Sequence, residues 1–232
     1  MELFYGIPSD NLIILGEDES NHLIHVKRAR SGDEVFVTDG LGHFFETTIQ
    51  SIEKKQCTLQ ITSTETKIRQ PYSLHIAIAP TKNIDRVEWF LEKATEIGIE
   101  EITFLICRHS ERREIKTDRL MRVLISSMKQ SLKPYLPKLN PITDYKTFIE
   151  NHNSGTRLIF HMSAGDNNSL NTLYKANDNL LALIGPEGDF HADELELAGK
   201  NGFQQASLGS SRLRTETAAL SVCTIFNFIN SR

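Results

Sequence analysis

Hydrophobic and polar residues alternate along much of the first 70 positions, which is the period expected of strands with one buried face. Cys57, Leu59 and Ile61 alternate with polar residues, so this segment is expected to bury one side. Residues 34–38 and 43–49 are rich in strand-forming residues, and the Asp39-Gly40 pair between them can take the positive φ of a tight turn. We expect a small β barrel or sandwich here, with one helix over residues 20–30.

From Leu74 onward, strand-like and helix-like patterns alternate. Ile84, Val87, Leu91 and Ala94 fall on one face of a helix. Strands are predicted at residues 74–79, 101–107, 158–162, 180–184 and 206–208, and further helices at residues 117–132, 193–200 and 215–229. This alternation is typical of an α/β fold in which a parallel sheet is covered on both faces. The pattern changes near Arg69-Gln70-Pro71, so we predict two domains, 1–71 and 72–232.

Two loops after predicted strands carry candidate binding chemistry, because ligands of open parallel sheets bind beyond the carboxyl ends of the strands. In Gly185-Pro186-Glu187-Gly188 the glycines let backbone approach a ligand, and Glu187 adds a negative charge. The second loop runs from Leu208-Gly209 to Thr215, which we predict to be the N-cap of a helix whose first N–H groups are free. Each loop alone is also typical of an ordinary turn or capped helix. His161 follows another strand, where a packing role is favoured.

Composition and missing motifs narrow the class of protein. The 232 residues, 39% hydrophobic and 24% charged, fit one or two folded domains. There is neither an apolar stretch long enough for a membrane span nor a signal-peptide pattern at the N-terminus, so we expect a cytoplasmic protein with no membrane partner. Three widely spaced cysteines predict neither disulfides nor a zinc site. The sequence lacks the dinucleotide-binding, P-loop and nucleophile-elbow motifs, which disfavours those classes of enzyme. It also lacks metalloprotease and other metal-ligand spacings, so we expect no metal.

Charge is unevenly distributed, although the whole chain carries a net charge of −4. Residues 108–138 contain nine Lys or Arg residues and three Asp or Glu residues, and a smaller basic cluster lies at residues 27–30. Such clusters occur on solvated helix faces and also on surfaces that contact RNA phosphates. The candidate RNA-binding residues are Lys27, Arg28, Arg30, Arg108, Arg112, Arg113 and Lys129.

The two loops together resemble the signature of the RsmE family of 16S ribosomal RNA uracil-N3 methyltransferases, within the SPOUT superfamily. The matching segments are Ile184 to Gly188, Leu208-Gly209 and Leu213 to Ala218. Residues 22–28, Gly32-Asp33 and Asp39-Gly40 resemble the PUA-like RNA-binding domain of that family. The chain departs from the family pattern at Asp189-Phe190-His191 and at Ser210-Ser211.

The resemblance implies a SPOUT-type parallel sheet with a C-terminal trefoil knot, a PUA-like β-barrel domain and a homodimer. It implies S-adenosyl-L-methionine as cofactor and N3 of one uridine in the decoding region of 16S rRNA, in the small ribosomal subunit, as the methylated atom. The cofactor-binding residues it implies are Met162, Leu183, Gly185, Pro186, Glu187, Gly188, Leu208, Gly209, Leu213 and Thr217.

Two residues near the second loop are candidate catalytic residues for that reaction. Arg214 is placed to stabilise the anionic uracil ring, and Glu216 to orient this arginine or accept the proton. Two alternatives stay open: a non-catalytic RNA-binding or ribosome-assembly protein, and a SPOUT methyltransferase acting on another RNA site.

Overall fold

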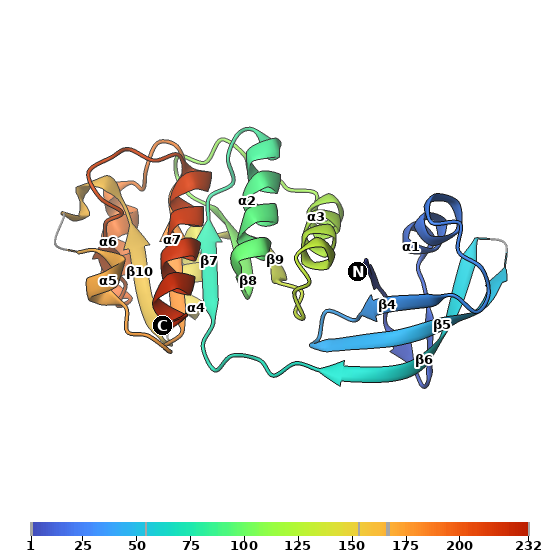
Figure 1. Ribbon diagram of the computed structural model, residues 1–232. Helices are drawn as coiled ribbons and strands as arrows, with labels where there is room; N and C mark the ends of the chain where they lie inside the picture. The colour runs from blue at the N-terminus through green and yellow to red at the C-terminus, as the bar shows by residue number, and fades with distance from the viewer. Residues whose placement is uncertain (1, 54, 153, 166–167, 232) are drawn as a thin grey trace. The chain divides into compact units, whose positions relative to one another are not determined.

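The computed structural model describes residues 2–53, 55–152, 154–165 and 168–231, which form two compact units (Figure 1). The N-terminal unit contains Met1–Arg69 and Ile125–Leu136, and the C-terminal unit contains Gln70–Leu124 and Pro137–Arg232. The main division falls close to the predicted boundary after residue 71. Unlike the prediction, residues 125–136 belong with the N-terminal unit, where the Leu136 amide donates to the Gly40 carbonyl at 2.8 Å.

The N-terminal unit is built on a curled, largely antiparallel sheet. Its strands are β1 (Leu3–Tyr5), β2 (Pro8–Ser9), β3 (Leu12–Ile14), β4 (Glu34–Thr38), β5 (His43–Glu53) and β6 (Gln56–Thr66). They lie in the order β1-β4-β5-β6-β3-β2, with only the β1–β4 pair parallel. Two register shifts between β5 and β6 bend the sheet. Its core contains Ile13, Val37, Ile49, Cys57 and Leu59, which confirms the predicted alternation.

Two local predictions for this unit have different outcomes. The Asp39-Gly40 turn is confirmed: Gly40 has φ +69, and the Asp39 carboxylate accepts from the Leu41 amide at 2.7 Å. The helix expected over residues 20–30 is instead α1 (Glu17–Asn21), continued by a π-helical turn, His22–Val26. It ends earlier than predicted because Arg28 takes a left-handed conformation, φ +54.

The C-terminal unit is a six-stranded parallel sheet with helices on both faces, which confirms the α/β prediction. Its strands are β7 (Leu74–Ile78), β8 (Glu101–Ile106), β9 (Lys138–Asp144), β10 (Thr156–Phe160), β11 (Leu180–Ile184) and β12 (Gln204–Ala206). They lie in the order β12-β10-β11-β7-β8-β9. The helices are α2 (Ile84–Ile97), α4 (Tyr145–Asn151), α5 (Leu170–Leu173), α6 (Ala192–Lys200) and α7 (Thr215–Asn230). Helix α3 (Thr117–Gln130) begins in this unit, and its residues from Ile125 onward belong to the N-terminal unit.

The alternation of side chains along the central strands explains this layering. Leu181 and Leu183 of β11 pack in one cluster with Phe148 of α4 and Ala198 of α6. The intervening residues of β11 face the opposite side, where α7 packs against β7, β11 and α2 (Figure 1). All five residues of β11 are buried, so the strand is apolar throughout, as expected of a central parallel strand. No helix in the described part of the chain is long and apolar enough to cross a membrane.

Candidate functional site

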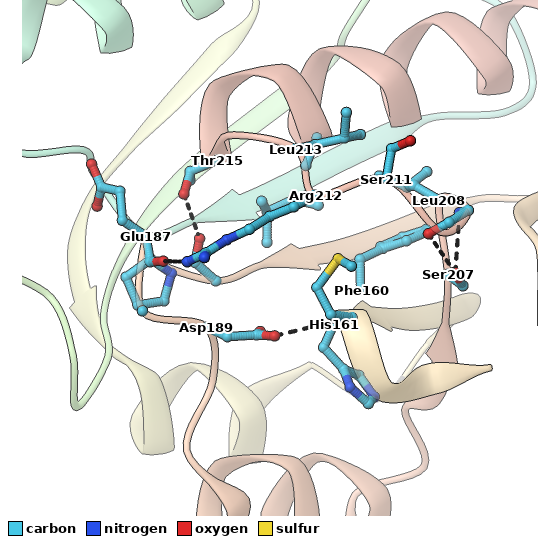
Figure 2. Close-up of a pocket in the computed structure, with 17 residues that line it drawn as sticks. Phe160, His161, Glu187, Asp189, Ser207, Leu208, Ser211, Arg212, Leu213 and Thr215 are labelled. Atoms are coloured by element: carbon cyan, nitrogen blue, oxygen red, sulfur yellow. Dashed lines mark hydrogen bonds between the residues drawn. The ribbon is translucent and has the colours of Figure 1, made fainter. Parts of the chain in front are cut away.

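A pocket lies at the carboxyl ends of β10, β11 and β12, where the sequence predicted a ligand site (Figure 2). Its volume of about 310 Å³ is at the lower end for small-molecule pockets. Three chain segments form it: the end of β10, the loop after β11, and the loop that joins β12 to α7. The lining residues are Phe160, His161, Met162, Ile184, Gly185, Pro186, Glu187, Gly188, Asp189, Ser207, Leu208, Gly209, Ser211, Arg212, Leu213, Thr215 and Ala218.

The loop after β11 is held by its own backbone and by one buried aromatic residue. The Asp189 amide donates to the Pro186 carbonyl at 2.9 Å, which closes a turn. Phe190 is buried in the core beneath the loop and anchors its end. A Cβ on Gly185 would lie 3.0 Å from the Phe190 ring and 3.3 Å from the Phe190 amide nitrogen. Glycine at position 185 therefore allows the loop to fold tightly over Phe190.

The loop after β12 is tied to the loop after β11 by two hydrogen bonds. The Thr215 hydroxyl donates to the Gly185 carbonyl at 3.0 Å, and the Arg212 guanidinium donates to the Glu187 carbonyl at 3.4 Å (Figure 2). The prediction of Thr215 as N-cap was wrong. Arg214 occupies that position with extended backbone, φ −71 and ψ 155, which leaves the Thr215 hydroxyl free to bond the neighbouring loop.

A third loop, after β8, reinforces this edge of the sheet. The Arg112 guanidinium donates to the carbonyls of Thr81 at 3.1 Å and Lys82 at 2.6 Å, beyond the end of β7. The Lys82 amide in turn donates to the Glu187 carboxylate at 3.3 Å. The Lys82 ammonium donates a hydrogen bond to the Glu111 carboxylate, which raises the pKa of Lys82, so Lys82 stays positively charged at neutral pH. The loops after β7, β8 and β11 are thus joined to one another.

Most residues predicted to bind a cofactor line the pocket. They are Met162, Gly185, Pro186, Glu187, Gly188, Leu208, Gly209 and Leu213. Leu183 does not line it, because its side chain is fully buried in the core cluster that also contains Phe190, and Thr217 lies half-buried in the first turn of α7. The prediction missed lining residues such as Asp189 and Arg212, which adjoin the motif residues in the same loops. Taking each predicted loop as a whole, and not only its motif residues, would have included both Asp189 and Arg212.

His161 also lines the pocket, yet its imidazole does not face the other labelled residues. The side chain is buried, and neither ring nitrogen has a hydrogen-bond partner in the described chain. Figure 2 shows the ring turned away from Arg212 and Leu208. This placement agrees with the packing role favoured from the sequence.

The two predicted catalytic residues lie beside the pocket and are not among its lining residues. The Arg214 side chain is exposed. Glu216 is buried, with 6% of its surface exposed, and its carboxylate lies 3.7 Å from Nε of Arg86 in α2. Its second oxygen has no hydrogen-bond partner among the described residues. Arg86, which the sequence analysis missed, therefore neutralises Glu216 in place of Arg214. No motif could have shown this, because only the fold brings α2 to α7.

The predicted RNA-binding residues divide between the two units. In the N-terminal unit, Arg28 and Arg30 are exposed and Lys27 pairs with the Glu2 carboxylate. Lys129 is largely buried and pairs with the Glu19 carboxylate.

In the C-terminal unit, Arg113 is exposed beside α4, near Lys146. Arg108 contacts Nδ1 of His191 and the Asp193 carboxylate, both at 3.1 Å. The Arg112 guanidinium bonds two backbone carbonyls. Since Lys27, Lys129, Arg108 and Arg112 are all engaged within the chain, the most available cations of the predicted set are Arg28, Arg30 and Arg113.

The described residues contain no cluster of three or more His, Cys, Asp or Glu side chains placed to hold a metal ion. The fold and the pocket define an α/β protein with a pocket at the carboxyl edge of its parallel sheet and a second, small β domain.

Comparison with known proteins identifies the family. Residues 69–227 match the RNA methyltransferase domain, and residues 15–62 match the RNA methyltransferase PUA domain. The chain therefore belongs to this family of RNA methyltransferases.

Individual relatives agree over nearly the whole chain. Ribosomal RNA small subunit methyltransferase E of Mesomycoplasma hyopneumoniae is 29% identical, over 95% of this chain and 96% of the relative. A crystal structure described as a probable rRNA-methyltransferase from Porphyromonas gingivalis is 39% identical, with a TM-score of 0.92 over 100% of this chain and 99% of its own.

A third relative links the fold to a ligand. The crystal structure of ribosomal RNA small subunit methyltransferase E from Neisseria gonorrhoeae, bound to S-adenosyl methionine, is 25% identical with a TM-score of 0.85, over 99% of this chain and 98% of its own. Together with the domain matches, these relatives confirm the resemblance to the RsmE family.

Proposed function

We propose that this protein transfers a methyl group from S-adenosyl-L-methionine to N3 of one uridine in the decoding region of 16S rRNA, in the cytoplasm. The observation that carries the proposal is the pocket itself. Eight of the residues that the family resemblance assigns to the cofactor come together there from three separate loops. Relatives named for small-subunit rRNA methylation align along almost the whole chain, which supports the same substrate.

The pocket residues fit the proposed cofactor. Leu208 and Leu213 offer apolar surface, and half of the Met162 side chain is exposed at the rim. Gly185 and Gly188 let backbone approach a ligand closely. The carboxylates of Glu187 and Asp189 oppose a single guanidinium, that of Arg212, so the charge balance favours a cation.

S-adenosylmethionine supplies a methyl group on positively charged sulfur, which leaves as a neutral thioether that keeps the electron pair of the broken bond. The new bond forms at N3 of the uracil, whose proton must be removed. This reaction depends on alignment and on exclusion of water more than on a covalent nucleophile. We propose that Arg214 stabilises the negative charge on the deprotonated ring. Glu216, with one carboxylate oxygen unpartnered, is the proposed proton acceptor.

N3 lies on the base-pairing edge, so the target uridine has to be unpaired before it reacts. We propose that the PUA domain and the exposed basic residues hold the RNA through its phosphates, with Arg28, Arg30 and Arg113 as the main contacts. The other members of the predicted set are already paired within the chain, which makes them secondary contacts.

We further propose the trefoil knot and the homodimer of the SPOUT superfamily. The course of the chain supports the knot: it leaves β12 at one edge of the sheet and reaches α7, which packs on β7 and β11 and bonds the loop after β11 through Thr215. Two exposed aromatic residues support the dimer. Trp89 of α2 is 42% exposed and Phe228 of α7 is 58% exposed, and these helices are neighbours.

The function is tested by incubating the protein with labelled S-adenosylmethionine and small ribosomal subunits that lack the modification. We expect 3-methyluridine at one site, identified by mass and retention of the nucleoside. Transfer to another nucleotide or another RNA would replace the proposed substrate. Cofactor binding without transfer to this substrate would point to another RNA, and no cofactor binding at all would favour the non-catalytic RNA-binding alternative.

Two glycine substitutions provide matched controls for this assay. Gly185→Ala places a Cβ 3.0 Å from the Phe190 ring, which displaces the loop, and should lower transfer. Gly199→Ala, in α6, meets no atom within 4 Å and should leave transfer intact.

A further inference from the structure

Asp189 is an unusual residue for its position in the pocket. Its backbone has φ +61, a left-handed conformation that glycine adopts freely and aspartate only with help from its side chain. The side chain is half-buried at the pocket wall. A residue held in such a conformation at a binding site points to a role for its side chain.

The contacts of Asp189 join three loops. One carboxylate oxygen accepts from the Phe190 amide at 2.8 Å, and the other accepts from the Met162 amide at 3.3 Å, in the segment after β10. The Asp189 carbonyl lies 3.1 Å from Nδ1 of His109, in the loop after β8. Figure 2 shows the carboxylate directed across the pocket toward the backbone that follows His161. Asp189 therefore fixes the distance between two walls of the pocket.

The charge of Asp189 is not neutralised within the described chain. No Lys, Arg or His nitrogen of the described residues forms an ion pair with it. The guanidinium that lines the pocket, that of Arg212, donates instead to the backbone carbonyl of Glu187. Its two backbone hydrogen bonds hold the carboxylate in place at the pocket wall, so the pocket contains a fixed carboxylate that no cation of the described residues pairs with.

We propose that Asp189 is a positioning and selectivity residue: it joins the two pocket walls, and its charge makes the pocket prefer the cationic methyl donor to the neutral thioether product. The inference rests on the proposed function. S-adenosylmethionine carries one more positive charge than S-adenosylhomocysteine, which is otherwise almost the same molecule. A fixed carboxylate in a partly hydrated pocket therefore favours binding of the donor over binding of the product.

The test compares the two ligands by calorimetry in the wild-type protein and in two variants. Asp189→Asn removes the charge and keeps one oxygen, which can accept from the Met162 amide, while the hydrogen bond from the Phe190 amide is lost. It should weaken S-adenosylmethionine binding by about threefold to tenfold and change S-adenosylhomocysteine binding by less than about twofold. Asp189→Gly tolerates the left-handed backbone but loses the side-chain hydrogen bond that joins the two pocket walls. This variant should bind both ligands more weakly. Glu196→Gln, an equal loss of charge on the exposed face of α6, should change neither.

The outcomes distinguish failure of the selectivity role from failure of the proposed function. Equal affinities of wild type and Asp189→Asn for S-adenosylmethionine, or equal losses for both ligands, would overturn the selectivity role. Wild-type protein that binds neither ligand would overturn the proposed function, and the inference with it.

Two further readouts separate positioning from a purely structural role. In the ligand-free protein, hydrogen exchange of the Met162 amide should accelerate in Asp189→Gly and not in Asp189→Asn. In the assay, Asp189→Asn should raise KM for the cofactor with kcat almost unchanged. An unaltered exchange rate of the Met162 amide in Asp189→Gly would contradict the proposal that Asp189 joins the two pocket walls.

Discussion

The hydrogen bond between Thr215 and Gly185 is expected to support both the stability of the C-terminal unit and the shape of the pocket. The Thr215 side chain is almost fully buried, with 5% of its surface exposed, and its hydroxyl donates to the Gly185 carbonyl at 3.0 Å. Among the described residues, no other donor bonds this carbonyl. Thr215→Val keeps the shape of the side chain and removes only the donor, so the Gly185 carbonyl is left buried and unpaired.

The size of the effect follows from that unpaired carbonyl. Leaving a buried acceptor without a partner costs about 1–3 kcal/mol of unfolding free energy. For a protein of this size each kcal/mol corresponds to roughly 2–4 °C in Tm, so we expect Tm to fall by about 2–12 °C. The loop after β11 also loses its tie to α7. We therefore expect S-adenosylmethionine to bind more weakly to Thr215→Val than to the wild type.

Urea unfolding measures this loss directly, because the single tryptophan of the chain is Trp89 in α2, and its fluorescence reports on the C-terminal unit. Thr215→Ser keeps the hydroxyl and should retain most of the stability. Thr224→Val is the matched control, since Thr224 is exposed on the same helix and bonds only the Leu220 carbonyl of its own helix. A Thr215→Val variant as stable as Thr224→Val would refute the reasoning.

Three further predictions concern charge. Arg214→Ala should lower turnover by about 100-fold with cofactor affinity unchanged; near-normal turnover of Arg214→Ala would contradict its role. Affinity for small-subunit rRNA should fall as salt rises, and Arg28→Ala should reduce the slope of log K against log salt by about 1; salt-insensitive binding would exclude these contacts. Burial lowers the pKa of the His75 imidazole from 6.5 to about 4. The nearby Glu101 carboxylate opposes this shift, whereas the charges of His152 and Lys138 add to it. As the pH falls, His75 of the unfolded chain binds a proton at a higher pH than His75 of the folded chain. The free energy of unfolding is therefore highest above about pH 6.5 and falls by at most about 3 kcal/mol as the pH drops toward 4. Urea unfolding at several pH values should show this loss in the wild type and not in His75→Gln.

Hydrophobic periodicity was sufficient to predict the elements that are long or buried. The central strand β11 was predicted with its exact limits because all its residues are apolar, and α2 because its buried residues recur at helical spacing. Strand β9 was missed, since it lies at the edge of the sheet, contains Pro141 and is only partly buried. The seven-residue helix α4 was missed because it is too short to show a period. Its start depends on Asp144, whose carboxylate accepts from the Lys146 and Thr147 amides.

The candidate site was predictable only as far as its residues are consecutive. Gly185 to Gly188 form a local motif, and the chain that carries them has to turn beyond the end of β11 wherever that strand lies. The pairing of Glu216 with Arg86, by contrast, joins residues 130 positions apart in the sequence. The bond from Arg112 to the Thr81 carbonyl likewise depends on the neighbouring strands β7 and β8. Such contacts follow from strand order, which periodicity alone does not determine.

The loops that form the pocket depend on these distant contacts for their rigidity. Loops rich in glycine lose more conformational freedom on ordering than other loops, so they need external ties to hold a ligand in one geometry. Arg112, Thr215 and Asp189 provide such ties, each through a side chain that bonds backbone of another loop. Methyl transfer depends mainly on alignment of the reacting atoms. Substitutions at these three residues should therefore weaken cofactor binding more than the loss of an exposed cation proposed to contact RNA, such as Arg28 or Arg113, even though none of the three need touch the RNA.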